Sequence, residues 1–366
     1  MNDRARSAFL FLSLLQARVG SSLVSKLGDL PPEAVLDLDG ARLALRIKMT
    51  TKAIVAFDEL KRGFDAAKIE NRLDERSLRA VTLTDAEYPK LLKEMPDSPP
   101  ALFVDGRLPD GPAVALVGSR KSSVTGNDAA RRLGLALAEK GVWVISGLAL
   151  GIDAAAHAGA VAGGGPTVGV LGCGIDVVYP KSNRALFEEV RGCGGLVSEY
   201  YLGESPLAWR FPARNRIISG LSDYVVVVEA AEKSGALITA RHALEAGGDV
   251  WAVPGTMNAP ECRGSNRLLA DGAGVLWDID EFVAMVAPEQ ESIEPKTVPQ
   301  AAIPVGLPES EALVLAGVGF EPTPSDVVAG RSGVSMRELL PALTLLELKG
   351  YISRDAAGAF VRRSAS

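Results

Sequence analysis

The stretch FPARNRIISGLSDYVVVVEA, residues 211–230, decides the fold of this chain. Its second half, Tyr224–Ala230, is an unbroken apolar, β-branched run, which is typical of a strand buried on both faces of a parallel sheet. The first half and the residue before it carry Arg210, Arg214 and Arg216. Arginines beside a central strand predict an anion site, because guanidinium groups bind phosphate oxygens. The alternative interpretation is that these arginines pair with carboxylates.

Strand and helix patterns alternate around this stretch. Apolar runs predict strands at residues 113–117, 142–145, 167–171, 196–197, 224–228 and 250–253. Between them, helical periodicity predicts helices at residues 127–140, 152–161, 183–190 and 236–246. This alternation is typical of an α/β fold, and it predicts a Rossmann-like, doubly wound parallel sheet.

The composition changes on both sides of this region. Residues 1–80 contain short amphipathic helices, which predict a helical, SAM-like (helix-hairpin-helix) domain before the Rossmann-like domain at 81–286. Residues 287–308 hold five prolines without apolar periodicity and predict a linker. Residues 309–366 have the pattern of three helices and a hairpin with its tip at 356–358, which predicts a winged-helix domain.

Charge, cysteine content and hydropathy bound the functional class. The net charge of −6 and the pI near 5.3 exclude a broad basic coat, so nucleic-acid binding requires a local patch. The three cysteines form no CxxC pair, which disfavours a disulfide framework or a zinc site and favours the reducing cytoplasm. Arg4 and Arg6 precede an apolar run too short for a signal peptide, and no run long enough to span a membrane occurs.

Glycine turns follow the first three predicted strands. Ligands of open α/β sheets bind outside the carboxyl ends of the strands, and glycine leaves backbone amides accessible there. The residues concerned are Gly118, Ser119, Arg120, Gly147 and Gly174. Together with Lys181, Arg214 and Arg216, they predict an anion-binding edge.

Aromatic residues lie near the same predicted edge: Tyr179, Phe187, Tyr200, Tyr201, Trp209 and Phe211. Guanidinium groups beside aromatic rings suit single-stranded nucleic acid, because charges follow the backbone while bases stack on rings. The alternative is that Phe187 and Phe211 fill the core.

The signatures of common enzymes and cofactor sites are missing. No GxGxxG follows the first strand and no Walker motif occurs, so we expect no nicotinamide or ATP cofactor by those routes. Asp153 and His157 are four residues apart on a predicted helix, which indicates a structural contact rather than a metal or acid–base site. Glu199 and Glu229 end strands and can orient arginines as readily as take protons. We therefore expect no catalytic residues and no metal.

Several motifs together resemble one family. GSR (118–120), SGLALGIDAAAHAGA (146–160), VLGCGIDVVYPKSN (170–183), FPARNRIISGLS (211–222) and VVVVEAAEKSGALITARHALEAGGDVWAVPG (225–255) occur in order. In this order and spacing, the region from about Tyr88 to Trp277 closely resembles the DNA-processing family DprA, also called Smf.

The resemblance implies a non-enzymatic protein that binds single-stranded DNA, protects incoming DNA, forms a homodimer and loads the RecA recombinase during natural transformation. It implies a basic DNA pocket at Arg120, Lys181, Arg214 and Arg216, with Asn183 and Asn215 beside them. It also implies Phe187 as a base-stacking residue.

Two interpretations other than a DNA-binding core are disfavoured by the sequence. LOG-type nucleotide phosphoribohydrolases share the GSR turn but need a PGGxGTxxE segment, whereas here residues 234–240 are followed by no acid until Glu245. A transcription factor that uses its tail is disfavoured because the third tail helix balances Arg337 and Lys349 with two glutamates, so the tail can equally bind protein.

Arg214 and Arg216 are expected to act differently. Residues two apart on a helix point about 200° apart. One of them is therefore expected to face DNA while the other pairs with a strand-end carboxylate such as Glu199 or Glu229.

Overall fold

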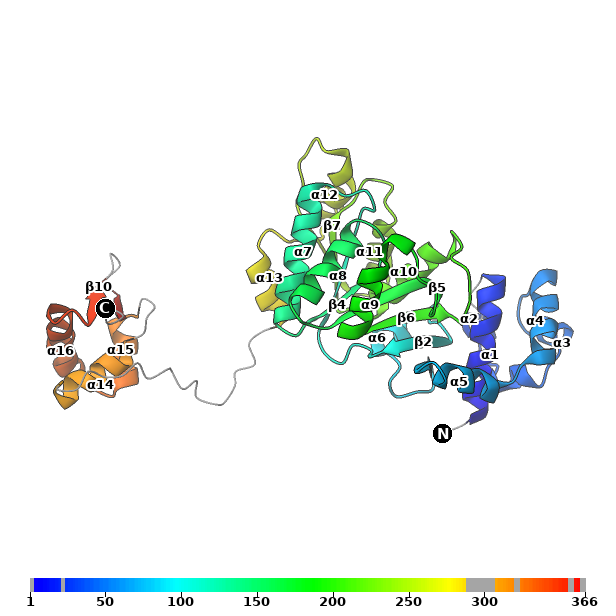
Figure 1. Cartoon of the computed structure of the whole chain (residues 1–366), viewed down its shortest axis with the longest axis horizontal. Coiled ribbons are helices and arrows are strands. Elements are labelled where there is room, and N and C mark those ends of the chain that lie inside the picture. Colours follow the sequence, from blue (N-terminus) through cyan, green and yellow to red (C-terminus); the bar gives the residue numbers. More distant parts are fainter. Residues whose placement is uncertain (1–2, 21–23, 288–306, 319–322, 355–358, 363–366) are drawn as a thin grey trace. The chain divides into compact units, whose positions relative to one another are not determined.

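The computed structural model describes residues 3–20, 24–287, 307–318, 323–354 and 359–362 (Figure 1). They belong to two compact units, one within residues 1–289 and the other within residues 290–366. The first unit is built on a nine-stranded sheet in the order β1-β2-β6-β5-β4-β3-β7-β8-β9. The strands are β1 (Leu78–Thr82), β2 (Ala101–Gly106), β3 (Ala113–Gly118), β4 (Trp143–Ser146), β5 (Thr167–Gly174), β6 (Gly195–Tyr200), β7 (Tyr224–Glu229), β8 (Asp249–Ala252) and β9 (Gly274–Val275).

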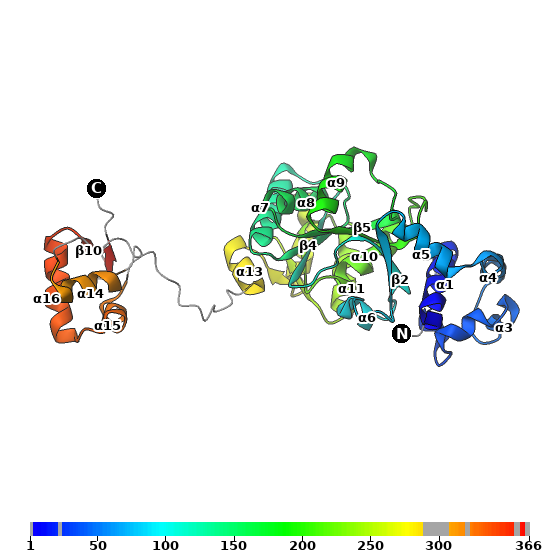
Figure 2. The same cartoon turned by 60° about the horizontal axis from the view of Figure 1, so that its bottom comes forward.

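Helices cover both faces of this sheet (Figures 1 and 2). One face carries α7 (Val124–Glu139), α8 (Ile152–Ala162), α9 (Arg184–Cys193) and α13 (Ile279–Val286). The other carries α6 (Lys90–Glu94), α10 (Arg210–Gly220), α11 (Ala236–Glu245) and α12 (Arg263–Ala270). The β-branched run of β7 explains why both faces are covered, since Val225 packs under the second set and Val226 under the first.

The predicted doubly wound α/β sheet is confirmed, with three additional strands. All strands from β6 to β9 in the sheet order run parallel. The apolar pattern did not predict β1, which pairs antiparallel with β2, or β2, which also pairs antiparallel with β6. It did not predict the two-residue β9 at the other edge of the sheet either. Strands β1 and β2 lie outside the alternating strand–helix pattern, so hydrophobic periodicity gave no βαβ signal for them.

The N-terminal helices are α1 (Asp3–Val19), α2 (Val24–Leu27), α3 (Gly40–Ala44), α4 (Thr51–Gly63) and α5 (Ala66–Asp74), with a 3₁₀ turn at Pro32–Leu36. They share a core in which the rings of Phe11 and Phe57 lie 5.0 Å apart. Leu10 of α1 belongs instead to the core beneath the sheet, with Phe103 and Leu196. The boundary predicted between residues 80 and 81 falls inside β1, and the division of this unit into two domains stays a prediction.

The second unit is a winged helix, as predicted. Its helices are α14 (Glu309–Gly317), α15 (Ser325–Ser332) and α16 (Met336–Leu348), followed by the hairpin β10 (Ile352–Arg354) and β11 (Phe360–Arg362). Leu315, Val328 and Leu346 from the three helices meet in its core. Most of the predicted linker, residues 288–306, and the predicted wing tip at 356–358 lie outside the described residues.

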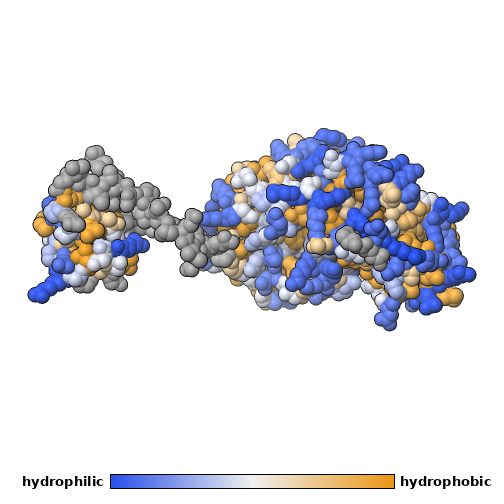
Figure 3. All heavy atoms as spheres, turned by 90° about the horizontal axis from the view of Figure 1, so that it is seen from below, coloured by the Kyte–Doolittle hydropathy of each residue, from blue (hydrophilic) through white to orange (hydrophobic). Residues whose placement is uncertain are grey.

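The surface of the first unit is mixed in character. On the face drawn in Figure 3, hydrophilic residues predominate and apolar residues lie between them. In the parts of the chain that the structure describes, no helix is long and apolar enough to cross a membrane.

Helices α7 and α8 pack at very short range, and this contact tests the fold. A Cβ atom on Gly159 of α8 would overlap the carbonyl oxygen of Arg131 in α7. We expect Gly159→Ala to lower the free energy of unfolding by about 1–3 kcal/mol, because the backbones must move apart. Urea denaturation followed by circular dichroism measures this change.

Gly192 of α9 is the matched control, because a Cβ atom there meets open space. Gly192→Ala should stabilise the protein by up to about 1 kcal/mol through helix propensity. Equal stabilities of the two variants would contradict the close packing of α7 and α8.

Candidate nucleic-acid interface

A groove of about 950 Å³ lies at the carboxyl ends of the parallel strands. The sheet order reverses at β3, because β4, β5 and β6 follow on one side while β7, β8 and β9 follow on the other. Ligands of open α/β sheets bind at such a reversal. We call this cavity the strand-end groove, and its lining includes Arg120, Lys121, Tyr179, Phe211, Lys233 and Glu261.

The loop after β3 is anchored by the end of β7. The backbone N–H of Ser119 donates to the carbonyl oxygen of Glu229 over 2.7 Å. The buried carboxylate of Glu229 accepts from the backbone N–H of Ser123 over 2.9 Å and from its hydroxyl group. This loop therefore holds the exposed side chains of Arg120 and Lys121 at the groove on a fixed backbone.

Two aromatic rings form a surface beside Arg120. The rings of Tyr179 and Phe211 lie 5.2 Å apart at 36°. The guanidinium carbon of Arg120 lies 5.4 Å from the centre of the Phe211 ring. Tyr179 is 43% exposed, and both rings line the groove. Phe211 is half-buried, so Tyr179 offers the more exposed ring. An exposed ring beside a cation can stack a base while the cation contacts the backbone.

Phe187 does not share this surface. Its side chain is 5% exposed and packs in the core with Leu171 and Leu196. The base-stacking role implied for Phe187 does not fit this position, since a ring enclosed by aliphatic side chains has no free face. The alternative interpretation, that Phe187 fills the core, describes its position.

Arg214 lies at the floor of the groove, with its side chain 3% exposed. Its Nη1 donates to the carbonyl oxygen of Gly147 over 2.9 Å and to that of Val170. A Cβ atom on Gly147 would overlap the guanidinium group, so this glycine makes room for Arg214 and not for a ligand. Burial lowers the pKa of Arg214, and burial raises the pKa of the neighbouring Asp153 carboxyl.

The other predicted polar residues near the groove bind neighbouring loops. A Cβ atom on Gly174 would lie 2.7 Å from the carbonyl oxygen of Tyr201, so this glycine also serves internal packing. Asn183 donates to the carbonyl oxygen of Leu148 over 3.0 Å, and Asn215 donates to that of Gly235 over 3.1 Å. Lys181 is exposed two residues beyond Tyr179.

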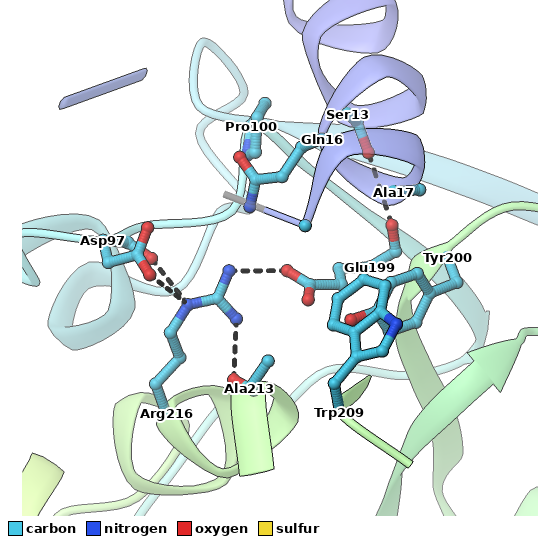
Figure 4. Close-up of a pocket in the computed structure, with 11 residues that line it drawn as sticks. Ser13, Gln16, Ala17, Asp97, Pro100, Glu199, Tyr200, Trp209, Ala213 and Arg216 are labelled. Atoms are coloured by element: carbon cyan, nitrogen blue, oxygen red, sulfur yellow. Dashed lines mark hydrogen bonds and ion pairs between the residues drawn. The ribbon is translucent and has the colours of Figure 1, made fainter. Parts of the chain in front are cut away.

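Arg216 is a further predicted site residue that lies outside the groove lining. Its Nη2 lies 2.6 Å from the Glu199 carboxylate, and its Nε lies 3.3 Å from that of Asp97 (Figure 4). The cavity beside it measures about 50 Å³, which is too small for a nucleotide. Burial lowers the pKa of Arg216, but the two carboxylates outweigh it and raise the pKa overall. The predicted pairing of one arginine with Glu199 is confirmed, and we leave Arg216 out of the proposed interface.

Arg210 is also engaged within the protein. Its guanidinium group donates to the carbonyl oxygen of Ala17 over 3.1 Å, pairs with Glu204 at 2.7 Å and lies over the ring of Tyr200. The alternative interpretation, that these arginines pair with carboxylates, describes Arg210 and Arg216. Arg214 lines the groove with its guanidinium group bound to backbone carbonyl oxygens. The exposed cations at the groove lie on the neighbouring loops instead.

Asp153 and His157 have different partners: Asp153 accepts from the backbone N–H of Gly147 over 3.2 Å. Both are buried, and Nδ1 of His157 lies 2.8 Å from the hydroxyl of Thr167. Burial lowers the pKa of His157 to about 3, so the ring is neutral at physiological pH. Within the described ranges, no group of three or more His, Cys, Asp or Glu residues is placed to hold a metal ion.

Comparisons with known proteins agree along most of the chain. A family model described as DNA recombination-mediator protein A matches residues 79–287, and one described as the DprA winged helix domain matches residues 298–358. The chain is 34% identical to Protein Smf of Synechocystis over 317 residues, covering 77% of this chain and 80% of the relative. It is 41% identical to Protein Smf of Escherichia coli over 287 residues, covering 75% of each.

Two solved structures are similar in sequence and shape. DNA processing protein A from Streptococcus pneumoniae is 34% identical with a TM-score of 0.59, covering 69% of this chain and 92% of that one. DNA processing protein A from Helicobacter pylori, whose structure was described for its single-stranded DNA binding mode, is 30% identical with a TM-score of 0.51. That match covers 56% of this chain and 94% of the relative.

The Arg216–Glu199 pair is predicted to stabilise the fold rather than to bind a ligand. Arg216→Met leaves the buried Glu199 carboxylate without its main partner and should cost about 3–5 kcal/mol of unfolding free energy. The double variant Arg216→Met, Glu199→Gln should recover more than half of that loss, because it removes the unpaired charge. Urea denaturation of the wild type, of Arg216→Met, of Glu199→Gln and of the double variant measures both values. A loss below about 1 kcal/mol in Arg216→Met would contradict the role of the pair.

Proposed function

Because this chain belongs to the DNA recombination-mediator protein A family, the DprA/Smf proteins, we propose that it binds single-stranded DNA in the strand-end groove. One observation carries this proposal. Arg120 is exposed on an anchored loop beside the rings of Tyr179 and Phe211, at the point where the strand order reverses. The single-stranded DNA binding mode described for the Helicobacter pylori relative supports it.

The groove suits a single strand for physical reasons. Arg120 and Lys121 supply cations for the phosphates, and the exposed Lys181 lies beyond Tyr179. Tyr179 and Phe211 offer ring surface on which any base can stack, so binding is expected to show little sequence preference. In a duplex, the base faces are already stacked on each other and cannot use this surface. We therefore expect preference for single strands.

The buried residues act as positioning groups. Arg214 lines the groove floor, where it donates to the carbonyl oxygen of Gly147, and Gly118 and Ser119 form the backbone that presents Arg120. Asn183 and Asn215 hold the loops on either side. We assign direct phosphate contacts to Arg120 and Lys181, and an indirect role to the others.

Membership of the family supports the wider parts of the proposal. We infer that the protein protects incoming DNA, pairs with a second copy of itself and delivers the strand to the RecA recombinase during natural transformation. We also infer a cytoplasmic location, which the three cysteines without a disulfide support.

The LOG-type hydrolase is not proposed. The stretch that would supply its catalytic glutamate, residues 234–240, forms the loop after β7 and the first turns of α11. The next carboxylate along the chain is Glu245, at the far end of that helix. We therefore propose a binding protein without catalytic residues.

Arg120→Ala and Lys181→Ala test the groove. Each variant should weaken binding to all single-stranded sequences alike, because phosphates are common to all of them. Each should also reduce the slope of log affinity against log salt by about 0.7. Fluorescence anisotropy with labelled oligonucleotides at several salt concentrations measures both effects.

Lys140→Ala is the control, since this exposed lysine caps the end of α7 away from the strand ends. Unchanged salt slopes in both groove variants would remove Arg120 and Lys181 from the interface. A wild-type protein that preferred duplex to single-stranded oligonucleotides would contradict the proposed function itself.

The winged helix is expected to be dispensable for strand binding. The outer face of α16 exposes Leu340, Leu345 and Leu348, and its Lys349 cap pairs with Glu311 at 2.6 Å. A helix that reads DNA is more basic than this. A chain ending after Val286 should bind single strands within about tenfold of the full chain, or roughly 1.4 kcal/mol. Loss of binding by a folded truncated chain would identify the winged helix as the DNA-binding module.

A further inference from the structure

The strand-end groove has a second wall, and the lysine on that wall, Lys233, has no role in the function proposed above. Strands β3 and β7 are neighbours, but α7 follows β3 onto one face of the sheet while α11 follows β7 onto the other. Their connecting loops therefore diverge, and the groove opens between them. Arg120 and Lys121 lie on one wall, and Lys233 lies on the other.

Lys233 is free to meet a ligand. Its side chain is exposed, and within the described ranges it forms no ion pair. The loop that carries it is held at both ends, since Ser234 N donates to the carbonyl oxygen of Ala231 over 2.9 Å and Asn215 donates to that of Gly235 over 3.1 Å. The cation is therefore presented on an ordered backbone rather than on a loose loop.

An acidic residue lines the same part of the groove. Glu261, in the 3₁₀ turn Pro260–Cys262, is half-buried and belongs to the same lining as Lys233. Within the described residues it forms no ion pair with Lys233, so the two charges act separately on a ligand. A phosphate is attracted by the lysine and repelled by the glutamate, which limits how far an anionic chain can extend.

We propose that Lys233 forms a second phosphate subsite and that Glu261 marks its limit. A single strand then runs across the reversal of strand order, from Tyr179 and Arg120 to Lys233. This inference rests on the proposed function, because it names the path of the strand through the same groove.

The path has a definite length. From β5, which precedes Tyr179, to β7, which precedes Lys233, the sheet order crosses β4 and β3. Three interstrand spacings of about 4.8 Å give roughly 14 Å. A stacked strand advances about 3.4 Å per nucleotide, so this path accommodates about four nucleotides. A strand that starts on the Tyr179 ring therefore needs about four nucleotides to reach Lys233, and a shorter oligonucleotide that keeps its contact with this ring does not reach it.

The test compares oligo-dT of about three nucleotides with oligo-dT of about twelve, using fluorescence anisotropy on the full chain. Lys233→Gln should bind the short oligonucleotide as the wild type does. It should bind the long one about fivefold more weakly at 0.1 M salt, with a salt slope reduced by about 0.7, the effect of one lost phosphate contact. Glu261→Gln should change affinity in the opposite direction, again only for the long oligonucleotide.

Lys140→Gln is the matched control for the loss of one positive charge outside the groove, and it should leave both affinities unchanged. The second subsite is overturned if Lys233→Gln keeps the wild-type affinity and salt slope for the long oligonucleotide. It is also overturned if this variant loses the same factor for both lengths. If the wild type binds neither oligonucleotide, the proposed function is overturned, and the second subsite with it.

Discussion

Three buried guanidinium groups on one helix constrain the first unit of this protein. Arg210, Arg214 and Arg216 of α10 are almost completely removed from solvent. A buried charge is tolerated only where partners replace its lost hydration. The three guanidinium groups have partners in three different elements. Arg210 donates to the end of α1, Arg214 to the turn after β4, and Arg216 pairs with the end of β6. The position and rotation of α10 are therefore specified from three sides.

The groove depends on this constraint. Phe211 lies in the first turn of α10, so the same contacts that hold the helix place its ring beside Arg120. The carboxylate of Glu229 does the same for the loop after β3. Exposed cations are thus carried by loops whose backbones are tied to buried groups, which is how a rigid scaffold positions binding residues. A chain of net charge −6 can in this way concentrate positive charge at one edge of its sheet.

The sequence predicted the architecture well because the fold is repetitive. Each buried parallel strand is an apolar run and each covering helix has its own period, so every strand from β3 to β8 was predicted. Strands β1 and β2 carry no such signal, since they pair antiparallel outside the repeated unit. For the site, the strand-end turns were located correctly, but the destinations of individual side chains were not. Arg216 was predicted to bind an anion but pairs with Glu199 inside the protein, and Phe187 fills the core. In both cases the burial of the side chain is decided by partners far away in the sequence.

We propose that a single strand lies across the carboxyl ends of β5 and β3. Photocrosslinking tests it most directly, with oligo-dT that carries 4-thiothymidine and with mapping of the modified peptides by mass spectrometry. We expect crosslinks in the segments 118–123, 179–183 and 206–215, which surround the rings of Tyr179 and Phe211. Crosslinks confined to the winged helix or to helices α1–α5, with none in these segments, would contradict it.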